Sequence, residues 1–148
     1  MIETDKVINN IDISENEINV ILEKLHENKP SNIEIENIFN LIPDNKDMMK
    51  IFVNSIKLNE LWKNHYLYIL KNFNESRFKN SYEDICNGKI KKLPIIYVIN
   101  EHILIFENGR NRFYHLFKLG YKKIPIFIYK SDYMIFDIKK LIEMDFDL

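Results

Sequence analysis

The sequence Phe106-Glu107-Asn108-Gly109-Arg110-Asn111-Arg112 joins an apolar, strand-like run to a basic, helix-like run through one glycine. Gly109 is one of only three glycines in 148 residues. Glycine takes a positive φ without penalty and lets another group approach the backbone, so the pattern predicts a tight strand-to-helix turn. Two arginines follow where the free N–H groups of the new helix would lie, which indicates a pocket for an anion such as phosphate.

The side chains around this turn allow several roles. Arg110 and Arg112 leave the helix start in different directions, so one could hold a phosphate while the other reaches a second phosphate or the protein. Glu107 could bind a metal ion, pair with an arginine or act as a catalytic base. The alternative is a simple strand-to-helix corner with solvated arginines. The candidate phosphate-binding residues of this segment are Asn108, Gly109, Arg110, Asn111, Arg112 and His115.

Composition and charge favour one folded domain with an anionic partner. Apolar residues make up 46% of the chain, which is enough for a sizeable core. Residues 1–49 contain four basic and eleven acidic side chains, whereas residues 50–130 contain fifteen basic and six acidic ones. The basic middle suits a nucleotide or nucleic acid, although solvated lysines would give the same count.

Several classes of protein are not expected. One cysteine, Cys86, allows no disulfide within the chain, and the four histidines show no metal-ligand spacing. The first ten residues lack the pattern of a signal peptide, and no apolar run reaches the roughly 18 residues of a membrane span. We therefore expect a cytoplasmic protein with no membrane partner and no metal site built from cysteine or histidine.

The N-terminal half predicts mostly helices. A capping box at residues 14–17 introduces a helix whose apolar face includes Ile18 and Leu22. Alternation around Ile33 and Ile35 predicts a short strand, and residues 43–45 predict a turn. From residue 46 to 73 the spacing predicts one or two helices, and a shorter helix near Tyr82 ends at Gly88.

The C-terminal half predicts strands around the glycine turn. Two β-rich runs, 94–99 and 103–106, form a hairpin, and Gly109 opens a helix that Gly120 closes. A third run, 124–129, contains Pro125, which favours the start of a strand or an edge strand. A last short helix is predicted near residues 136–142.

An ordered set of motifs carries a family resemblance. The segments are Gly88-Lys89-Ile90-Lys91-Lys92-Leu93-Pro94-Ile95-Ile96-Tyr97-Val98, Ile105 to Arg112, Leu119-Gly120 and Ile124-Pro125-Ile126-Phe127-Ile128. In this order and spacing, residues 83–130 resemble the ParB/sulfiredoxin superfamily.

The resemblance implies a compact α/β (α+β) domain with a small mixed sheet and a Gly-x-x-Arg strand-turn-helix. Together with the charge and periodicity of the chain, the resemblance leads us to expect a single domain made of an acidic N-terminal helix and strand (1–45), a ParB/sulfiredoxin-like core (46–130) and a short C-terminal helix (131–148). It also implies a nucleoside triphosphate such as ATP or CTP, usually with Mg²⁺. The nucleotide-binding positions that it implies are Gly88, Pro94, Gly109, Arg110, Asn111 and Arg112, together with Arg77 upstream.

This chain departs from two familiar members of that superfamily. Sulfiredoxins carry a catalytic cysteine directly after the turn glycine, where this chain has Arg110, so reduction of a sulfinic acid by that route is excluded. Partition-type members add a DNA-binding module, for which the residues after Tyr129 are too few. Small amino-acid kinases also belong to the superfamily; Glu107 is the carboxylate nearest the turn, and Glu83 and Asp84 precede Gly88.

Three kinds of function remain open. The first is an Mg-dependent nucleotide hydrolase or a phosphotransferase to a small hydroxyl compound, with Glu107 as the candidate catalytic residue. The second is a nucleotide-binding regulatory module without turnover, whose acidic N-terminal segment binds a protein. The third is nucleic-acid binding or cleavage through the basic middle.

Overall fold

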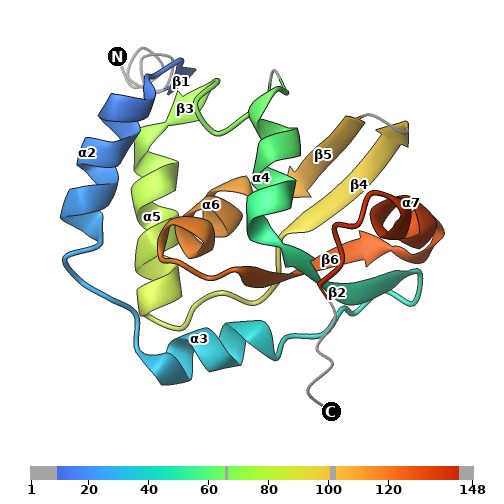
Figure 1. Ribbon diagram of the computed structural model, residues 1–148. Coiled ribbons are helices and arrows are strands. Elements are labelled where there is room, and N and C mark those ends of the chain that lie inside the picture. Colours follow the sequence, from blue (N-terminus) through green and yellow to red (C-terminus); the bar gives the residue numbers. More distant parts are fainter. Residues whose placement is uncertain (1–9, 66, 101–102, 144–148) are drawn as a thin grey trace, which may run out of the picture.

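The computed structural model describes residues 10–65, 67–100 and 103–143 of the chain. A mixed four-stranded sheet has the strand order β2-β6-β4-β5 (Figure 1). In it β6 runs antiparallel to β2 and parallel to β4, and β4 and β5 form an antiparallel hairpin. A second, two-stranded sheet pairs β1 with β3. The strands are β1 Asn10–Ile11, β2 Met48–Asn54, β3 Phe73–Asn74, β4 Ile95–Asn100, β5 Ile103–Asn108 and β6 Lys123–Tyr129.

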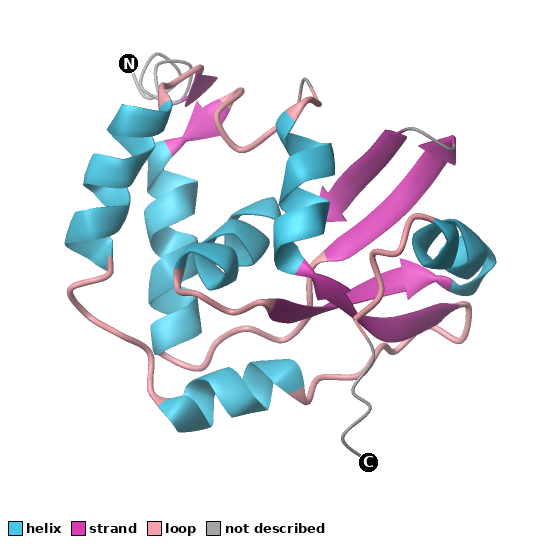
Figure 2. Ribbon diagram, viewed as in Figure 1, coloured by secondary structure: helices cyan, strands magenta, loops and turns pink. Residues whose placement is uncertain are grey.

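Helices surround the sheet, and several of them gather beside it rather than only over its faces (Figures 1 and 2). The predicted mixed α/β class is therefore confirmed. Within the described part of the chain, no helix has the length and apolar character that crossing a membrane requires. The helices are α2 Glu15–Leu25, α3 Asn32–Phe39, α4 Ser55–Lys63, α5 Glu75–Cys86, α6 Arg110–Lys118 and α7 Tyr133–Ile138, with a 3-10 turn at Lys130–Asp132.

One hydrophobic cluster extends from α2 to the segment after α7, so both sheets and the surrounding helices share a core. Trp62 of α4 lies near its aromatic centre, with ring centroids 4.8 Å from Tyr68, 4.5 Å from Phe106 and 6.0 Å from Phe113. These contacts attach α4 and the following loop to the strand–turn–helix unit around Gly109.

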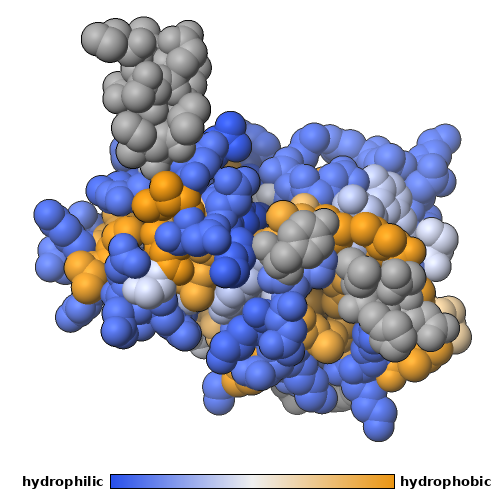
Figure 3. All heavy atoms as spheres, turned by 90° about the horizontal axis from the view of Figure 1, so that it is seen from above, coloured by the Kyte–Doolittle hydropathy of each residue, from blue (hydrophilic) through white to orange (hydrophobic). Residues whose placement is uncertain are grey.

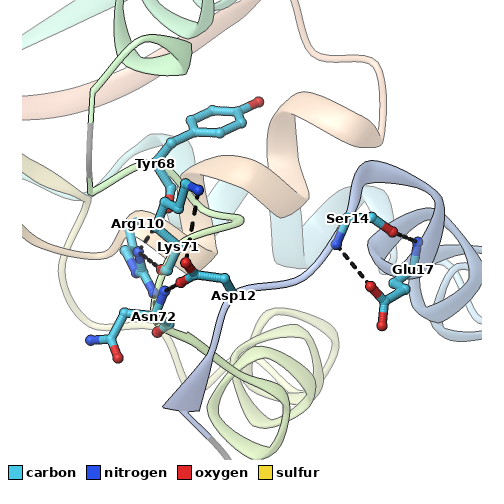
Figure 4. Close-up of polar contacts among 7 residues, drawn as sticks. All are labelled: Asp12, Ser14, Glu17, Tyr68, Lys71, Asn72 and Arg110. Carbon is cyan, nitrogen blue, oxygen red and sulfur yellow. Dashed lines mark hydrogen bonds and ion pairs between the residues drawn. The ribbon is translucent and has the colours of Figure 1, made fainter.

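The predicted capping box begins α2. The Ser14 hydroxyl accepts a hydrogen bond from the Glu17 N–H at 3.1 Å, and the Glu17 carboxylate accepts one from the Ser14 N–H at 2.9 Å (Figure 4). Ile18 and Leu22 are buried, as the helical spacing predicts. Local sequence therefore determines this helix start.

The predicted strand around Ile33 and Ile35 is wrong, because these residues belong to α3. Ser31 caps the helix by accepting from the Glu34 N–H at 3.1 Å. Ile35 and Ile38, three residues apart, are buried, whereas Ile33 is exposed. The short alternation of apolar and acidic residues also fits one face of a two-turn helix.

Of the one or two helices predicted over residues 46–73, only α4 is present among the described residues. The start forms β2, which pairs with β6 along seven residues, and the end leads into β3. Ile51 and Val53 of β2 are buried with period-two spacing. Asn54 ends the strand and caps α4, since its side chain accepts from the Lys57 N–H at 3.0 Å. The spacing of apolar residues in this segment fits either a helix or a strand, and pairing with the distant strand β6 selects the strand.

The predicted C-terminal helix is present as α7, but it ends at Ile138, and the segment after it covers the outer edge of β2. The Asn54 N–H donates to the Leu141 carbonyl at 2.8 Å, and the Glu143 N–H donates to the Phe52 carbonyl at 2.7 Å. An edge strand with unpaired N–H and C=O groups can pair with other chains, and this short segment occupies part of that edge.

The hairpin, the helix after Gly109 and the strand β6 are all present as predicted. Pro125 nevertheless lies in an interior strand rather than at an edge. The Phe127 N–H donates to the Pro94 carbonyl at 2.8 Å, so Phe127 faces the β4 side of the strand. Pro125, two residues earlier, faces the same side but lies before β4 begins. The missing N–H of proline therefore removes no hydrogen bond from the sheet.

The helix predicted near Tyr82 begins earlier than expected, because Asn74 caps α5 by accepting from the Arg77 N–H at 3.0 Å. Its end is as predicted. Gly88 has a φ of 70°, and the Lys89 N–H donates to the Asp84 carbonyl at 2.9 Å, which closes the helix as a Schellman motif.

His115, predicted at the phosphate site, instead lies in the core between α5 and α6. It is fully buried, its Nε2 is 2.8 Å from the Phe78 carbonyl oxygen, and its ring centroid is 4.0 Å from that of Phe78. Burial lowers the pKa of His115 to about 3. Burial, assisted by the charges of Lys29 and Lys118, lowers the pKa of the neighbouring His26 to about 4.

These two histidines predict a loss of stability in acid. Their folded-state pKa values lie below the ordinary value of 6.5, so the unfolded chain takes up more protons and the free energy of unfolding falls as the pH drops below 6.5. For buried His115 the loss between pH 7 and pH 5 is about 2 kcal/mol. Urea unfolding at both pH values should show a smaller loss for His115→Gln than for the wild type. An equal loss in both proteins would contradict the assignment.

Candidate functional site

A cavity of about 530 Å³ lies beside the Gly109 turn, between α5, the first turn of α6, the end of β5 and the loop that precedes β3. We call it the α5–α6 cavity. Five consecutive residues predicted for phosphate binding, 108–112, line it, as do Arg77 and Glu107. The lining residues are Asn10, Leu67, Asn72, Asn74, Arg77, Asn80, Ser81, Asp84, Ile90, Phe106, Glu107, Asn108, Gly109, Arg110, Asn111 and Arg112.

Gly109 allows the turn that forms one wall of the cavity. Its φ is 81°, in the left-handed region, and a Cβ atom placed on it would lie 2.8 Å from the Pro94 Cα. The helix begins at once, since the Phe113 N–H donates to the Gly109 carbonyl at 2.9 Å. Glycine provides no side-chain cap, so the N–H groups of the first turn depend on other acceptors.

The Arg110 guanidinium is occupied by hydrogen bonds within the protein. Its Nη1 donates to the carbonyl oxygens of Leu67 at 3.1 Å, Tyr68 at 3.3 Å and Lys71 at 3.1 Å. Its Nη2 donates to the Asn72 carbonyl at 2.9 Å, and Figure 4 shows the guanidinium directed at this loop. Arg110 thus organises the loop that forms another wall of the cavity, and its backbone remains part of the helix N-terminus.

Arg112 is the arginine with free hydrogen-bonding capacity. Its Nε and Nη2 are buried and have no hydrogen-bond partner among the described residues. Burial lowers the pKa of the Arg112 guanidinium, and the negative charge of Asp84 partly opposes that shift. A buried donor without an acceptor is unfavourable unless a ligand or water supplies the acceptor. Arg112 as a whole is only partly buried and lines the cavity, so it can present positive charge to a ligand there.

One face of α5 forms the opposite wall. Asn74, Arg77, Ser81 and Asp84 all line the cavity, and their spacing of three and four residues places them on one side of a helix. Sequence reasoning selected only Arg77 of these as a ligand residue. The periodic polar face after Asn74 was the signal that could have identified the others.

Glu107, the candidate catalytic residue, borders the cavity but directs its carboxylate elsewhere. Its Oε1 accepts a hydrogen bond from the Tyr129 hydroxyl at 2.9 Å. That bond is the main reason why the pKa of Tyr129 is raised. Neighbouring residues of a strand point to opposite faces of the sheet. The Glu107 side chain therefore lies on the face of β5 opposite Phe106, which packs against Trp62. Asp84 is the other carboxylate that lines the cavity, and its charge opposes the lowering of the Arg112 pKa.

Gly88 and Pro94 are near the site without lining it. A Cβ atom on Gly88 would meet the Glu34 carboxylate, so this glycine faces α3. Pro94 packs behind Gly109 and supports the turn from outside the cavity. With His115 in the core, three of the predicted nucleotide-binding residues therefore have positions that suit packing rather than ligand contact.

The cavity is polar, with a positive bias. Three arginines and two carboxylates line it, accompanied by six asparagines and one serine. Within residues 10–65, 67–100 and 103–143, no group of three or more His, Cys, Asp or Glu side chains could hold a metal ion. Magnesium that arrives with a nucleotide needs only one or two protein carboxylates, and two carboxylates line the cavity.

The chain was compared with models of protein families, with curated proteins and with solved structures, and none of the three comparisons gives a match.

The two arginines should differ in their effect on stability. Arg110→Ala removes four hydrogen bonds from a charged donor and leaves carbonyl groups unpaired, so we expect a loss of about 2–4 kcal/mol in the free energy of unfolding. Arg112→Ala removes a buried cation with unpartnered nitrogens, so without ligand its stability should stay within about 1 kcal/mol of the wild type or exceed it. Urea denaturation measures both.

Equal destabilisation by the two substitutions would show that Arg112 has a structural partner. Arg112 would then stabilise the fold as Arg110 does, and it would not be free to bind a ligand.

Proposed function

We propose that this protein binds the phosphates of a nucleotide in the α5–α6 cavity and transfers or hydrolyses a phosphoryl group there. The observation that carries the proposal is Arg112, a partly buried arginine that lines a polar cavity of about 530 Å³ and whose Nε and Nη2 have no acceptor among the described residues. Guanidinium groups recognise phosphate oxygens through paired hydrogen bonds, so an arginine in this position suits a phosphate ligand.

The surroundings of Arg112 support an anionic ligand. The first turn of α6 has no side-chain cap, and helix N-termini favour negative charge. Arg77 lines the opposite wall and adds a second cation. A phosphate between Arg77, Arg112 and the α6 N-terminus would accept hydrogen bonds from backbone and side chains together.

The order of elements around the cavity is consistent with the ParB/sulfiredoxin resemblance. The hairpin β4–β5, the Gly109 turn, α6 and β6 follow one another as that resemblance implies. The proposal of a nucleoside triphosphate, ATP or CTP, with Mg²⁺ comes from this resemblance, and the arginine-lined cavity supplies residues that fit its phosphates.

For phosphoryl transfer, Asp84 takes the role that the sequence suggested for Glu107. Its position across the cavity from Arg112 allows it to orient a hydroxyl group or water and accept its proton. Arg112 and the α6 N-terminus would stabilise charge on the phosphoryl oxygens. Magnesium bound with the nucleotide would neutralise further charge.

A non-catalytic nucleotide-binding module is the second candidate. One observation favours it: of the two carboxylates that line the cavity, Glu107 is hydrogen-bonded to Tyr129. Binding without product would then be the outcome, with the nucleotide acting by stabilising the fold.

Nucleotide binding predicts a thermal shift that depends on Arg112. At a ligand concentration 100-fold above Kd, stabilisation of about 2.7 kcal/mol should raise Tm by roughly 5–10 °C. The test measures Tm with ATP, CTP, GTP and UTP, with and without magnesium chloride. Arg112→Ala should abolish the shift. Lys122→Ala, which removes the same charge from an exposed position, should keep it. No shift with any nucleotide would overturn the proposed function.

Turnover predicts a separate role for Asp84. Asp84→Asn should reduce the rate of magnesium-dependent nucleotide turnover by about 100-fold or more, because the amide cannot accept the proton. The thermal shift should persist, since the phosphate-binding groups are unchanged. Glu107→Gln is the matched control and should retain turnover. The opposite pattern would assign catalysis to Glu107, and a shift without product in the wild type would select the non-catalytic candidate.

A further inference from the structure

The N-terminal segment 10–13 and the loop 67–72 are joined into one wall of the α5–α6 cavity. β1 pairs with β3, and the Asn74 side chain donates to the Asn10 side chain at 2.9 Å. The Ile13 N–H donates to the Leu70 carbonyl at 2.9 Å. We call residues 10–13 and 67–74 the N-terminal wall. Asn10, Leu67, Asn72 and Asn74 from this wall line the cavity.

Asp12 connects the two parts of the N-terminal wall. Its Oδ1 accepts from the Asn72 N–H at 2.9 Å, and its Oδ2 lies 3.8 Å from the Lys71 Nζ (Figure 4). Asn72 has a φ of 51°, a left-handed conformation that asparagine tolerates better than most residues. The Asp12 carboxylate therefore stabilises a sharp turn at the cavity rim.

Arg110 attaches this wall to the anion site. Its guanidinium binds carbonyl oxygens of the loop, and its backbone lies in the first turn of α6. Burial lowers the pKa of Arg110, and the positive charge of Arg77 lowers it further. An anion between these two cations offsets the repulsion between them and so favours the position in which the Arg110 guanidinium is held on the loop.

We propose that anion binding in the α5–α6 cavity and docking of the N-terminal wall are coupled through Arg110, so that the cavity binds its ligand with the wall docked and the ligand in turn holds the wall in place. The inference rests on the proposed function and adds a form of regulation to it. Whatever releases residues 10–13 from the loop weakens binding, and by linkage binding protects these residues.

Residues 10–13 of the N-terminal wall are suited to such control because few contacts hold them to the loop and several of these contacts are exposed. Asp12 and Lys71 keep 67% and 55% of their side-chain surface exposed, and β1 and β3 are two residues each. Exposed ion pairs contribute little to stability, so a ligand can change the docked population.

The first measurement is hydrogen exchange of the full chain with and without ATP or CTP, each with magnesium chloride. Coupling predicts slower exchange in peptides that cover residues 10–13 and 67–74, by about threefold or more, together with protection at the start of α6. Protection at α6 with unchanged exchange in the wall would overturn the coupling and leave nucleotide binding intact. Absence of any binding would instead overturn the proposed function, and the coupling with it.

The second measurement compares two variants that remove one carboxylate each. Asp12→Ala should weaken ATP or CTP binding by about fivefold. Its sign is diagnostic, because loss of a negative charge would by simple electrostatics strengthen binding of an anion. Glu75→Ala, which breaks the exposed ion pair with Lys79 on α5, is the control and should leave affinity unchanged or slightly higher. An equal rise in both variants would overturn the coupling.

Discussion

The left-handed conformation of Gly109 determines how the site is built. At a φ of 81° the chain turns from β5 into α6 directly against Pro94, and a side chain at this position would collide with the Pro94 backbone. The turn brings the N-terminus of α6 to the end of the hairpin, with Gly109 as the single residue between β5 and α6. Both arginines then take their positions from the first turn of one helix, and the cavity forms beside it.

The two arginines of this turn divide its tasks. Arg110 uses its guanidinium to hold four carbonyl groups of a distant loop, whereas Arg112 keeps buried donors without a partner. The first arrangement stabilises the folded chain, whereas buried donors without an acceptor are unfavourable in the free protein. This contrast between the two arginines is the observation on which the proposal of an anionic ligand depends.

The fold around the turn was predictable where the relevant signals are local. The capping box of α2, the glycine end of α5 and the strand–glycine–helix order all depend on residues within a few positions of one another. The errors occurred where two structures fit the same spacing. Ile33 and Ile35 alternate with acidic residues yet lie on a helix, and β2 has a helix-like spacing yet pairs along seven residues with β6.

The candidate site also combines features that neighbouring residues determine with contacts that only folding determines. Residue types and spacing in the chain were sufficient to locate the turn at residues 108–112 that lines the cavity, because a glycine turn and the free N–H groups of a helix start arise from neighbouring residues. The partner that each side chain meets comes from folding: Arg110 reaches a loop some forty residues earlier, Glu107 meets Tyr129, and His115 turns into the core. Hydrogen bonds and burial depend on segments far apart in the sequence, so they are determined only when those segments pack together.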